Sequence, residues 1–293
     1  MAERATGGTR HEPSLPTDDD LLEALARGRE DVPFFAAYFC DRRLHDGQVD
    51  WVTNANGTIN LLLTGNRWGK TSVCTIRHCH ALFYKIGAEH RYTGPDGELD
   101  PLAMFRLRYR TIHCAGLYET AEMVWDDFCA LVRDNPRLGA WVKQPIPRTK
   151  PATVEFINGA RWLFRTLGDH GEGIDGNSFY LITIDEAGWE PRLAKIVDNV
   201  ARIRVADVGG RLDLVGTAKP GLSQEFFEIA LRAQAYLGDT RALDHVPESR
   251  GPAVLSQGVH IDPAVHGYAL DAGVDLEAVV AAWHQRRAGW RVA

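Results

Sequence analysis

The chain has 293 residues, of which 45% are hydrophobic and 25% charged, the composition of an ordinary globular protein. It contains no run of 18 apolar residues, so we expect no membrane-spanning helix and no membrane partner. The formal net charge of −6 argues against a protein that coats nucleic acid by bulk charge, but it leaves room for a local basic patch.

The N-terminal 17 residues are polar, carry Gly and Pro, and lack the apolar core of a signal peptide, which predicts a disordered tail on a cytoplasmic protein. Asp18, Asp19 and Asp20 supply acids for the first turn of a helix that we expect to stop near Gly28. The apolar stretch 33–39 should pack beside the core. The five cysteines form no CxxC pair and are most simply small buried hydrophobes.

A strand, a glycine turn and a helix follow one another from residue 59. Residues 59–64 are an apolar run, residues 65–69 read Gly-Asn-Arg-Trp-Gly, and residues 70–84 contain neither Gly nor Pro. This order is typical of a P-loop, in which backbone N–H groups face the phosphates of a nucleotide. The match to GxxxxGK[ST] is imperfect, because Thr64 stands where the first glycine is expected. The alternative is a chance helix start with an exposed lysine.

Each position of this loop has an expected role. Lys70 should reach the β- and γ-phosphates, Thr71 should coordinate Mg²⁺, and Gly69 permits close backbone approach. Arg67 either contacts phosphate or braces the loop. The nucleotide-binding set is Gly65, Asn66, Arg67, Trp68, Gly69, Lys70, Thr71 and Ser72.

The middle of the chain alternates strands and helices. We expect a surface loop over 87–101, a buried strand over 110–115 and a helix from about 119 to 133. Residues 153–157 and 160–164 flank Asn158-Gly159, the signal of a hairpin with a type I′ turn. Residues 168–177 form an acidic, glycine-rich loop.

Two further strands end in polar residues. Residues 180–184 run into Asp185 and Glu186, where Asp185 would hold Mg²⁺ and Glu186 would act as the general base on an attacking water. A second carboxylate favours a hydrolase over a kinase, although two solvated acids at a strand end remain an alternative. Residues 211–215 lead to Thr217, whose hydroxyl could sense the γ-phosphate.

These elements predict an α/β fold with a largely parallel sheet covered on both faces. Helices are expected over about 223–236 and 276–287. In such sheets ligands bind at the carboxyl ends of the strands, where all three motifs lie. The sequence therefore predicts a P-loop ATPase that uses ATP and Mg²⁺.

Weaker signals leave alternatives open. Cys74 and His78 could share a helix face and bind zinc, but burial is the better interpretation, as it is for His113 and Cys114. Clusters of basic residues could contact DNA phosphates or could be solvated faces. They are Arg106 to Arg110, Arg133 to Lys150, Arg202 with Arg204, and Arg286, Arg287 and Arg291.

Residues 65–71, Ile184-Asp185-Glu186-Ala187 and Gly216-Thr217-Ala218 resemble the Walker A, Walker B and coupling motifs of phage terminase large subunits. The resemblance covers about residues 30 to 236. It implies an additional-strand P-loop ATPase that forms a ring on the phage portal protein in the host cytoplasm. Double-stranded DNA and the terminase small subunit are the other implied partners.

The resemblance also assigns roles to residues. It implies Lys70 and Thr71 as phosphate and Mg²⁺ ligands, Asp185 as the Mg²⁺ carboxylate, Glu186 as catalytic base and Thr217 as coupling residue. Many relatives carry an arginine about ten residues before the Walker B aspartate, where this chain has Asp175. A trans-acting arginine would then have to be Arg161, Arg165, Arg202 or Arg204.

Residues 18–236 are predicted to be the ATPase domain, and residues 237–293 a small lid-like subdomain or a linker toward an absent nuclease domain. About 75 residues follow Thr217, too few for the nuclease of full-length terminases, so we expect no nuclease activity. Two alternatives stay open. One is another nucleic-acid-stimulated ATPase such as a helicase-like remodeller; the other is a non-hydrolysing regulatory module, against which the Asp185-Glu186 pair argues.

Overall fold

The computed structural model describes residues 18–64, 67–98, 100–146, 150–217, 226 and 259–261. The predicted disordered tail, the helices over 223–236 and 276–287 and the lid-like subdomain lie outside the described residues, apart from Phe226 and the segment 259–261. No helix in these ranges combines the length and the apolar character that crossing a membrane requires.

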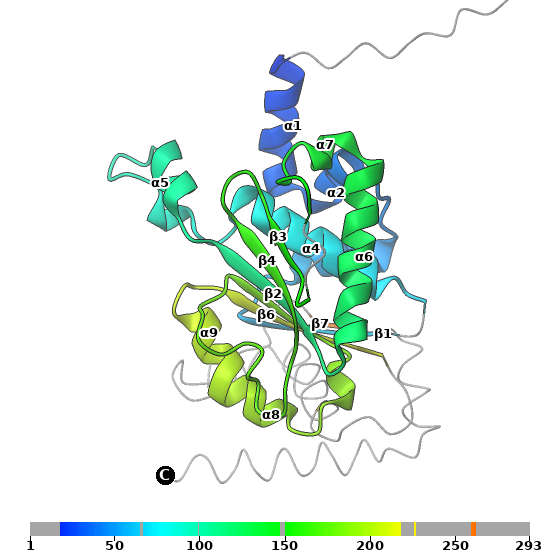
Figure 1. The fold of residues 1–293 in the computed structure, drawn as a ribbon. Coiled ribbons are helices and arrows are strands. Elements are labelled where there is room, and N and C mark those ends of the chain that lie inside the picture. The colour runs from blue at the N-terminus through cyan, green and yellow to red at the C-terminus, as the bar shows by residue number, and fades with distance from the viewer. Residues whose placement is uncertain are drawn as a thin grey trace, which may run out of the picture.

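A seven-stranded sheet in the order β3-β4-β2-β5-β6-β1-β7 forms the centre of the fold (Figure 1). Every neighbouring pair is parallel except β3 and β4, which form the antiparallel hairpin predicted around Asn158-Gly159. The predicted mostly parallel α/β class is confirmed. The strands are β1 (Ile59–Thr64), β2 (Arg110–Ala115), β3 (Thr153–Glu155), β4 (Arg161–Thr166), β5 (Leu181–Asp185), β6 (Arg211–Thr217) and β7 (Val259–Ile261).

Helices cover both faces of the sheet. One face packs against α2, α4 and α6 through a large aromatic core, and the other packs against the segment from α8 to α9 (Figure 1). The helices and short helical turns are α1 (Asp18–Glu30), α2 (Val32–Cys40), α3 (Asp46–Asn54), α4 (Lys70–Tyr84), η1 (Glu89–Arg91), α5 (Pro101–Arg106), α6 (Tyr118–Asp134), α7 (Pro136–Gly139), η2 (Ala187–Trp189), α8 (Leu193–Ile196), the π-helical η3 (Val197–Ala201) and α9 (Arg202–Ala206).

The order of the central strands brings the predicted motifs together. Strand β6 lies between β1, which precedes the glycine turn, and β5, which ends in the acids. This placement of an extra strand between the two is the additional-strand arrangement. The register pairs Thr64 with Thr217, so β1 and β6 end at the same level. The carboxyl ends of β5, β6 and β1 therefore form one edge.

Three local expectations were wrong or incomplete. Helix α1 does not stop near Gly28 but continues to Glu30; a Cβ at Gly28 would lie 2.6 Å from the Tyr84 hydroxyl, so glycine there allows close helix packing. The segment 87–101 is not all loop, since it contains η1 and the first residue of α5, which Asp100 caps. Helix α3 was missed, although His45 and Gln48 form a capping box at its start.

Candidate nucleotide site

The glycine turn leads directly into α4. Gly69 caps the helix with a left-handed φ of 93°, and no side chain caps it. Lys70 and Thr71 are its first two residues and are partly buried. A helix start without a side-chain cap, in a turn that needs glycine, suits the binding of an anion. Gly65 and Asn66 lie outside the described residues.

Helix α3 braces this turn from behind. The Nε2 atom of His45 lies 3.0 Å from the Trp68 carbonyl oxygen, and Gln48 Nε2 donates to the same oxygen at 3.1 Å. The His45 ring also meets the Trp68 ring edge-on, with centroids 4.9 Å apart. In a trans peptide the C=O and N–H point in opposite directions, so the Gly69 N–H points away from α3. The His45–Gln48 capping box was the sequence signal for this brace.

Asp185 is the last residue of β5 and is buried. Its Oδ1 accepts a hydrogen bond of 2.8 Å from the Glu186 backbone N–H. Its Oδ2 lies 3.4 Å from Nε2 of His113, a fully buried side chain of the neighbouring strand β2. The Glu186 N–H therefore fixes one carboxylate oxygen, and His113 Nε2, which has no hydrogen-bond partner among the described residues, lies near the other. His113, read from the sequence as a core residue only, is a neighbour of this site.

Glu186 contacts the predicted sensor residue. The Thr217 hydroxyl donates to Glu186 Oε1 at 3.0 Å, which joins the ends of β5 and β6. Glu186 has a left-handed backbone with φ 49° and ψ 37°, a conformation that costs a residue with a Cβ about 1–3 kcal/mol. Such strain is often found at functional sites.

Two buried oxygens at this edge have no hydrogen-bond partner among the described residues. They are Glu186 Oε2 and the Thr64 hydroxyl. Buried polar atoms are nearly always satisfied, so these two oxygens leave room for water or another polar group at the edge where the predicted motifs meet.

The oxygen ligands suit Mg²⁺. Within the described ranges no three or more His, Cys, Asp or Glu side chains group to hold a metal on their own. Mg²⁺ does not require such a group, since it keeps several waters and binds through one or two protein oxygens together with substrate phosphates. Thr71 and Asp185 carry oxygens that could hold Mg²⁺ in this way.

The sequence matches no family model and no curated protein. Among solved structures, the large terminase of bacteriophage HK97 is similar, with a TM-score of 0.51 and 16% identity over 84% of this chain and 51% of the terminase. The chain has the fold of a phage large terminase. It spans about half the length of the HK97 protein.

Two other terminase structures have lower scores. The ATPase domain of the Thermus phage P74-26 large terminase has a TM-score of 0.49 and 12% identity, over 67% of this chain and 72% of that domain. A large terminase from a thermophilic bacteriophage has a TM-score of 0.39 and 15% identity, over 60% of this chain and 39% of the terminase.

The four arginines considered as trans-acting groups are all engaged within this terminase-like fold. Arg204 pairs with Asp175, which therefore has a structural partner at the position where an arginine was expected. The other three have these contacts: Arg161 with Glu155 at 3.4 Å, Arg202 with Asp198 at 3.2 Å, and Arg165 with the carbonyls of Ala152 and Phe164 at 3.1 and 2.8 Å. The choice among them stays open.

The zinc alternative at Cys74 and His78 finds no support. Both side chains are buried, and the two ring nitrogens of His78 each lie 3.0 Å from a threonine hydroxyl, one on Thr111 and one on Thr183. The ring stacks on Trp162 at 4.4 Å. Burial raises the pKa of the Cys74 thiol, which disfavours the thiolate that zinc needs. These are core residues.

DNA contact by the basic clusters stays a prediction. Several of their members pair with acids of the same chain, for example Arg133 with Asp134 and Lys150 with Glu122. Arg286, Arg287 and Arg291 lie outside the described residues.

Proposed function

We propose that this chain is the ATP-hydrolysing motor domain of a DNA-packaging terminase, which moves double-stranded DNA into a procapsid. The observation that carries the proposal is the Thr217–Glu186 hydrogen bond beside Asp185, at the strand ends that adjoin Gly69, Lys70 and Thr71. It links a candidate base to a strand end that can respond to nucleotide state.

Each residue has a role in this proposal. The ammonium of Lys70 and the backbone N–H groups of the turn bind the phosphates, and Thr71 and Asp185 would hold Mg²⁺, which when bound would neutralise charge on the phosphates. The Glu186 backbone N–H keeps the Asp185 carboxylate in one orientation, with His113 Nε2 3.4 Å from its other oxygen.

Glu186 orients and deprotonates the attacking water. The proton passes to Glu186 Oε2, the oxygen without a partner among the described residues, while Oε1 stays bonded to Thr217. The water oxygen bonds to the γ-phosphorus, the bond from that phosphorus to ADP breaks, and the products are ADP and phosphate. Loss of the γ-phosphate would then reach β6 through the same Thr217–Glu186 contact.

The terminase fold supports a setting in viral DNA packaging as well as the chemistry of ATP hydrolysis. In that setting the chain works as a homo-oligomeric ring, with the portal protein, the terminase small subunit and duplex DNA as partners in the host cytoplasm. Mg²⁺ dependence and the absence of nuclease activity belong to the same proposal.

The test measures ATP hydrolysis by the full chain and by Lys70→Ala, with Mg²⁺, with and without duplex DNA and portal protein. We expect turnover by the wild type, stimulation by duplex DNA and loss of turnover in Lys70→Ala. A triplex-displacement assay separates a motor from a remodeller: a packaging motor displaces a third strand and leaves the duplex intact, whereas a helicase separates the duplex. A wild type that never hydrolyses ATP would contradict the proposal.

A further inference from the structure

A pocket of about 640 Å³ lies at the amino-terminal edge of the sheet, opposite the candidate nucleotide site. It is bounded by the start of β6, the residues before β5, the α1–α2 junction and the end of α3. None of the predicted nucleotide-site residues lines it. The pocket is therefore separate from the candidate nucleotide site.

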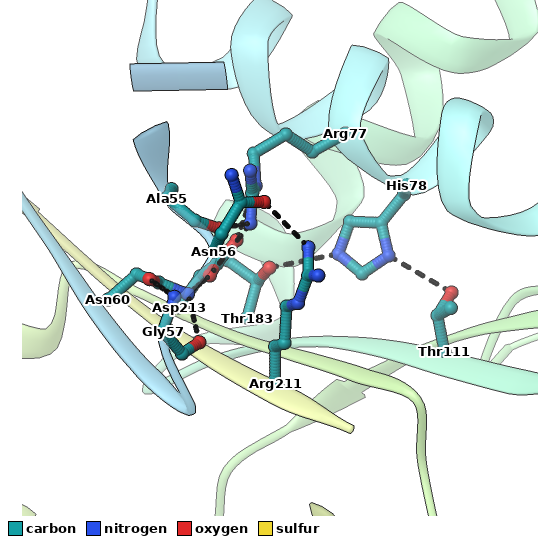
Figure 2. Close-up of polar contacts among 10 residues, drawn as sticks. All are labelled: Ala55, Asn56, Gly57, Asn60, Arg77, His78, Thr111, Thr183, Arg211 and Asp213. Atoms are coloured by element: carbon teal, nitrogen blue, oxygen red, sulfur yellow. Dashed lines mark hydrogen bonds and ion pairs between the residues drawn. The ribbon is translucent and has the colours of Figure 1, made fainter. Parts of the chain in front are cut away.

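One of the arginines that line the pocket is held by hydrogen bonds within the fold. Arg77 on α4 donates to both carboxylate oxygens of Asp213, at 2.7 and 3.2 Å, and to the Ala55 carbonyl at 2.9 Å (Figure 2). Asp213 also accepts a hydrogen bond of 2.9 Å from Asn60. The one buried carboxylate behind the pocket is thus already satisfied.

A second arginine is not neutralised. Arg211, the first residue of β6, lines the pocket and donates from Nη1 to the amide oxygen of Asn56 at 3.0 Å (Figure 2). Among the described residues no carboxylate lies within ion-pair distance of it. Burial, and then repulsion by Arg77, lowers the pKa of Arg211. The acids nearest in charge, Asp213 and Glu89, are already paired with Arg77 and Arg29. A partly buried guanidinium without an ion pair of its own is costly, and its fork of N–H donors suits a carboxylate.

The walls beside Arg211 are apolar and aromatic. Tyr109 and Tyr180 line the pocket as a stacked pair, with centroids 4.3 Å apart and planes 10° from parallel. Further apolar lining comes from Val32, Pro33, Val52, Ile86 and Leu181. A ligand for this surface needs an apolar body as well as a negative group.

Acidic residues limit how much negative charge such a ligand can carry. Glu30, Asp31 and Glu89 also line the pocket, and each pairs with an arginine: Glu89 with Arg29 at 2.9 Å, Glu30 with Arg29 at 3.7 Å and Asp31 with Arg27 at 3.5 Å. Their carboxylates still repel phosphate dianions and nucleic acid more strongly than they repel a single carboxylate. The charge pattern favours a monoanion.

We propose that this pocket binds an organic carboxylate with an apolar or aromatic body. The carboxylate takes the free donors of Arg211, and the body packs against Tyr109, Tyr180 and the neighbouring aliphatic side chains. Two sources share this chemistry: a free small acid, and the C-terminal carboxylate of a peptide that ends in an apolar residue.

The test is a ¹⁹F NMR titration of the full chain with 4-fluorobenzoate as the probe. We expect saturable broadening with the wild type, none with the neutral isostere 4-fluorobenzamide, and at least a tenfold loss of affinity in Arg211→Gln. Arg204→Gln is the matched control, since Arg204 lies outside the pocket, and it should bind as the wild type does. Lys70→Ala should also bind normally, so failure of the proposed function would leave this result intact.

Competition by N-acetylphenylalanine distinguishes the sources. If N-acetylphenylalanine displaces the probe at a lower concentration than benzoate does, the ligand is a peptide terminus. If it needs a higher concentration than benzoate, the ligand is a free acid. Arg211→Lys keeps the charge without the fork and should bind more weakly than the wild type while remaining folded by circular dichroism. Any of three results would overturn the proposal: the wild type shows no saturable binding of 4-fluorobenzoate, 4-fluorobenzamide binds equally well, or Arg211→Gln keeps the wild-type affinity.

Discussion

Replacing Thr217 by Val removes the hydroxyl that holds Glu186 and little else. Valine has nearly the same shape as threonine and suits a buried strand position such as the end of β6. The lost hydrogen bond, 3.0 Å from Thr217 Oγ1 to Glu186 Oε1, has a charged acceptor. Bonds of this kind contribute about 1.5–3 kcal/mol. If that energy orients the base for water activation, kcat for ATP hydrolysis falls by about 10- to 150-fold.

Two assays separate this effect from a loss of binding. Steady-state phosphate release gives kcat, and titration with a fluorescent ATP analogue gives the Kd. In Thr217→Val we expect kcat to fall and the Kd to change less than about threefold, since the hydroxyl contacts Glu186. Thr217→Ser is the control, because it keeps the donor and should retain most of the activity. An unchanged kcat in Thr217→Val, or an equal loss in Thr217→Ser, would refute this account of the hydrogen bond.

Three further predictions concern two residues of the nucleotide site and one buried histidine elsewhere in the fold. His113→Asn should leave ATP affinity without metal unchanged but raise the Mg²⁺ concentration needed for tight binding by about 10- to 100-fold, because Asp185 Oδ2 loses the imidazole nitrogen that lies 3.4 Å from it; nucleotide titrations at several Mg²⁺ levels measure this. Gly69→Ala should weaken ATP binding, because alanine at this position would need a φ of 93° and its Cβ would lie 2.4 Å from Gln48 Nε2. A variant with both the melting temperature and the ATP affinity of the wild type would contradict this prediction. Burial lowers the pKa of His80 to about 4, so between pH 6.5 and 4 the imidazole takes up a proton in the unfolded chain and not in the folded one. Stability is therefore lost as the pH falls through that range, by up to about 3 kcal/mol, and denaturant titrations should show a smaller loss in His80→Gln.

The sequence predicted the elements whose signals are local. Strand β1 and helix α4 have the predicted bounds because an apolar run, a glycine turn and a helix without Gly or Pro are contiguous. Asn158-Gly159 also predicted the hairpin, but its type I′ turn was wrong, because Gly159 has a positive φ of 79° and Asn158 does not. Their relative placement needed the register: the sequence named Glu186 and Thr217 separately, and only the β5–β6 pairing shows that they touch.

Other features depend on contacts between distant segments. His113 looked like a core residue, because nothing in the sequence says that β2 lies beside β5 and brings it to Asp185. The pairing of β7 with β1 across about 200 residues has no local signature. Arg211 looked like an ordinary strand start. The sequence does not show that Asp213 pairs with Arg77, while Arg211 bonds only to the neutral amide of Asn56 among the contacts of the described residues.

The central claim is that Glu186 is the base of an ATP-hydrolysing site, and Glu186→Gln tests it most directly. The amide is nearly isosteric with the carboxylate and keeps an oxygen for Thr217, but it cannot take the proton from water. Phosphate release with Mg²⁺ and ATP should fall by about 10²- to 10⁴-fold, while ATP binding remains. Hydrolysis by Glu186→Gln at the wild-type rate would contradict the account.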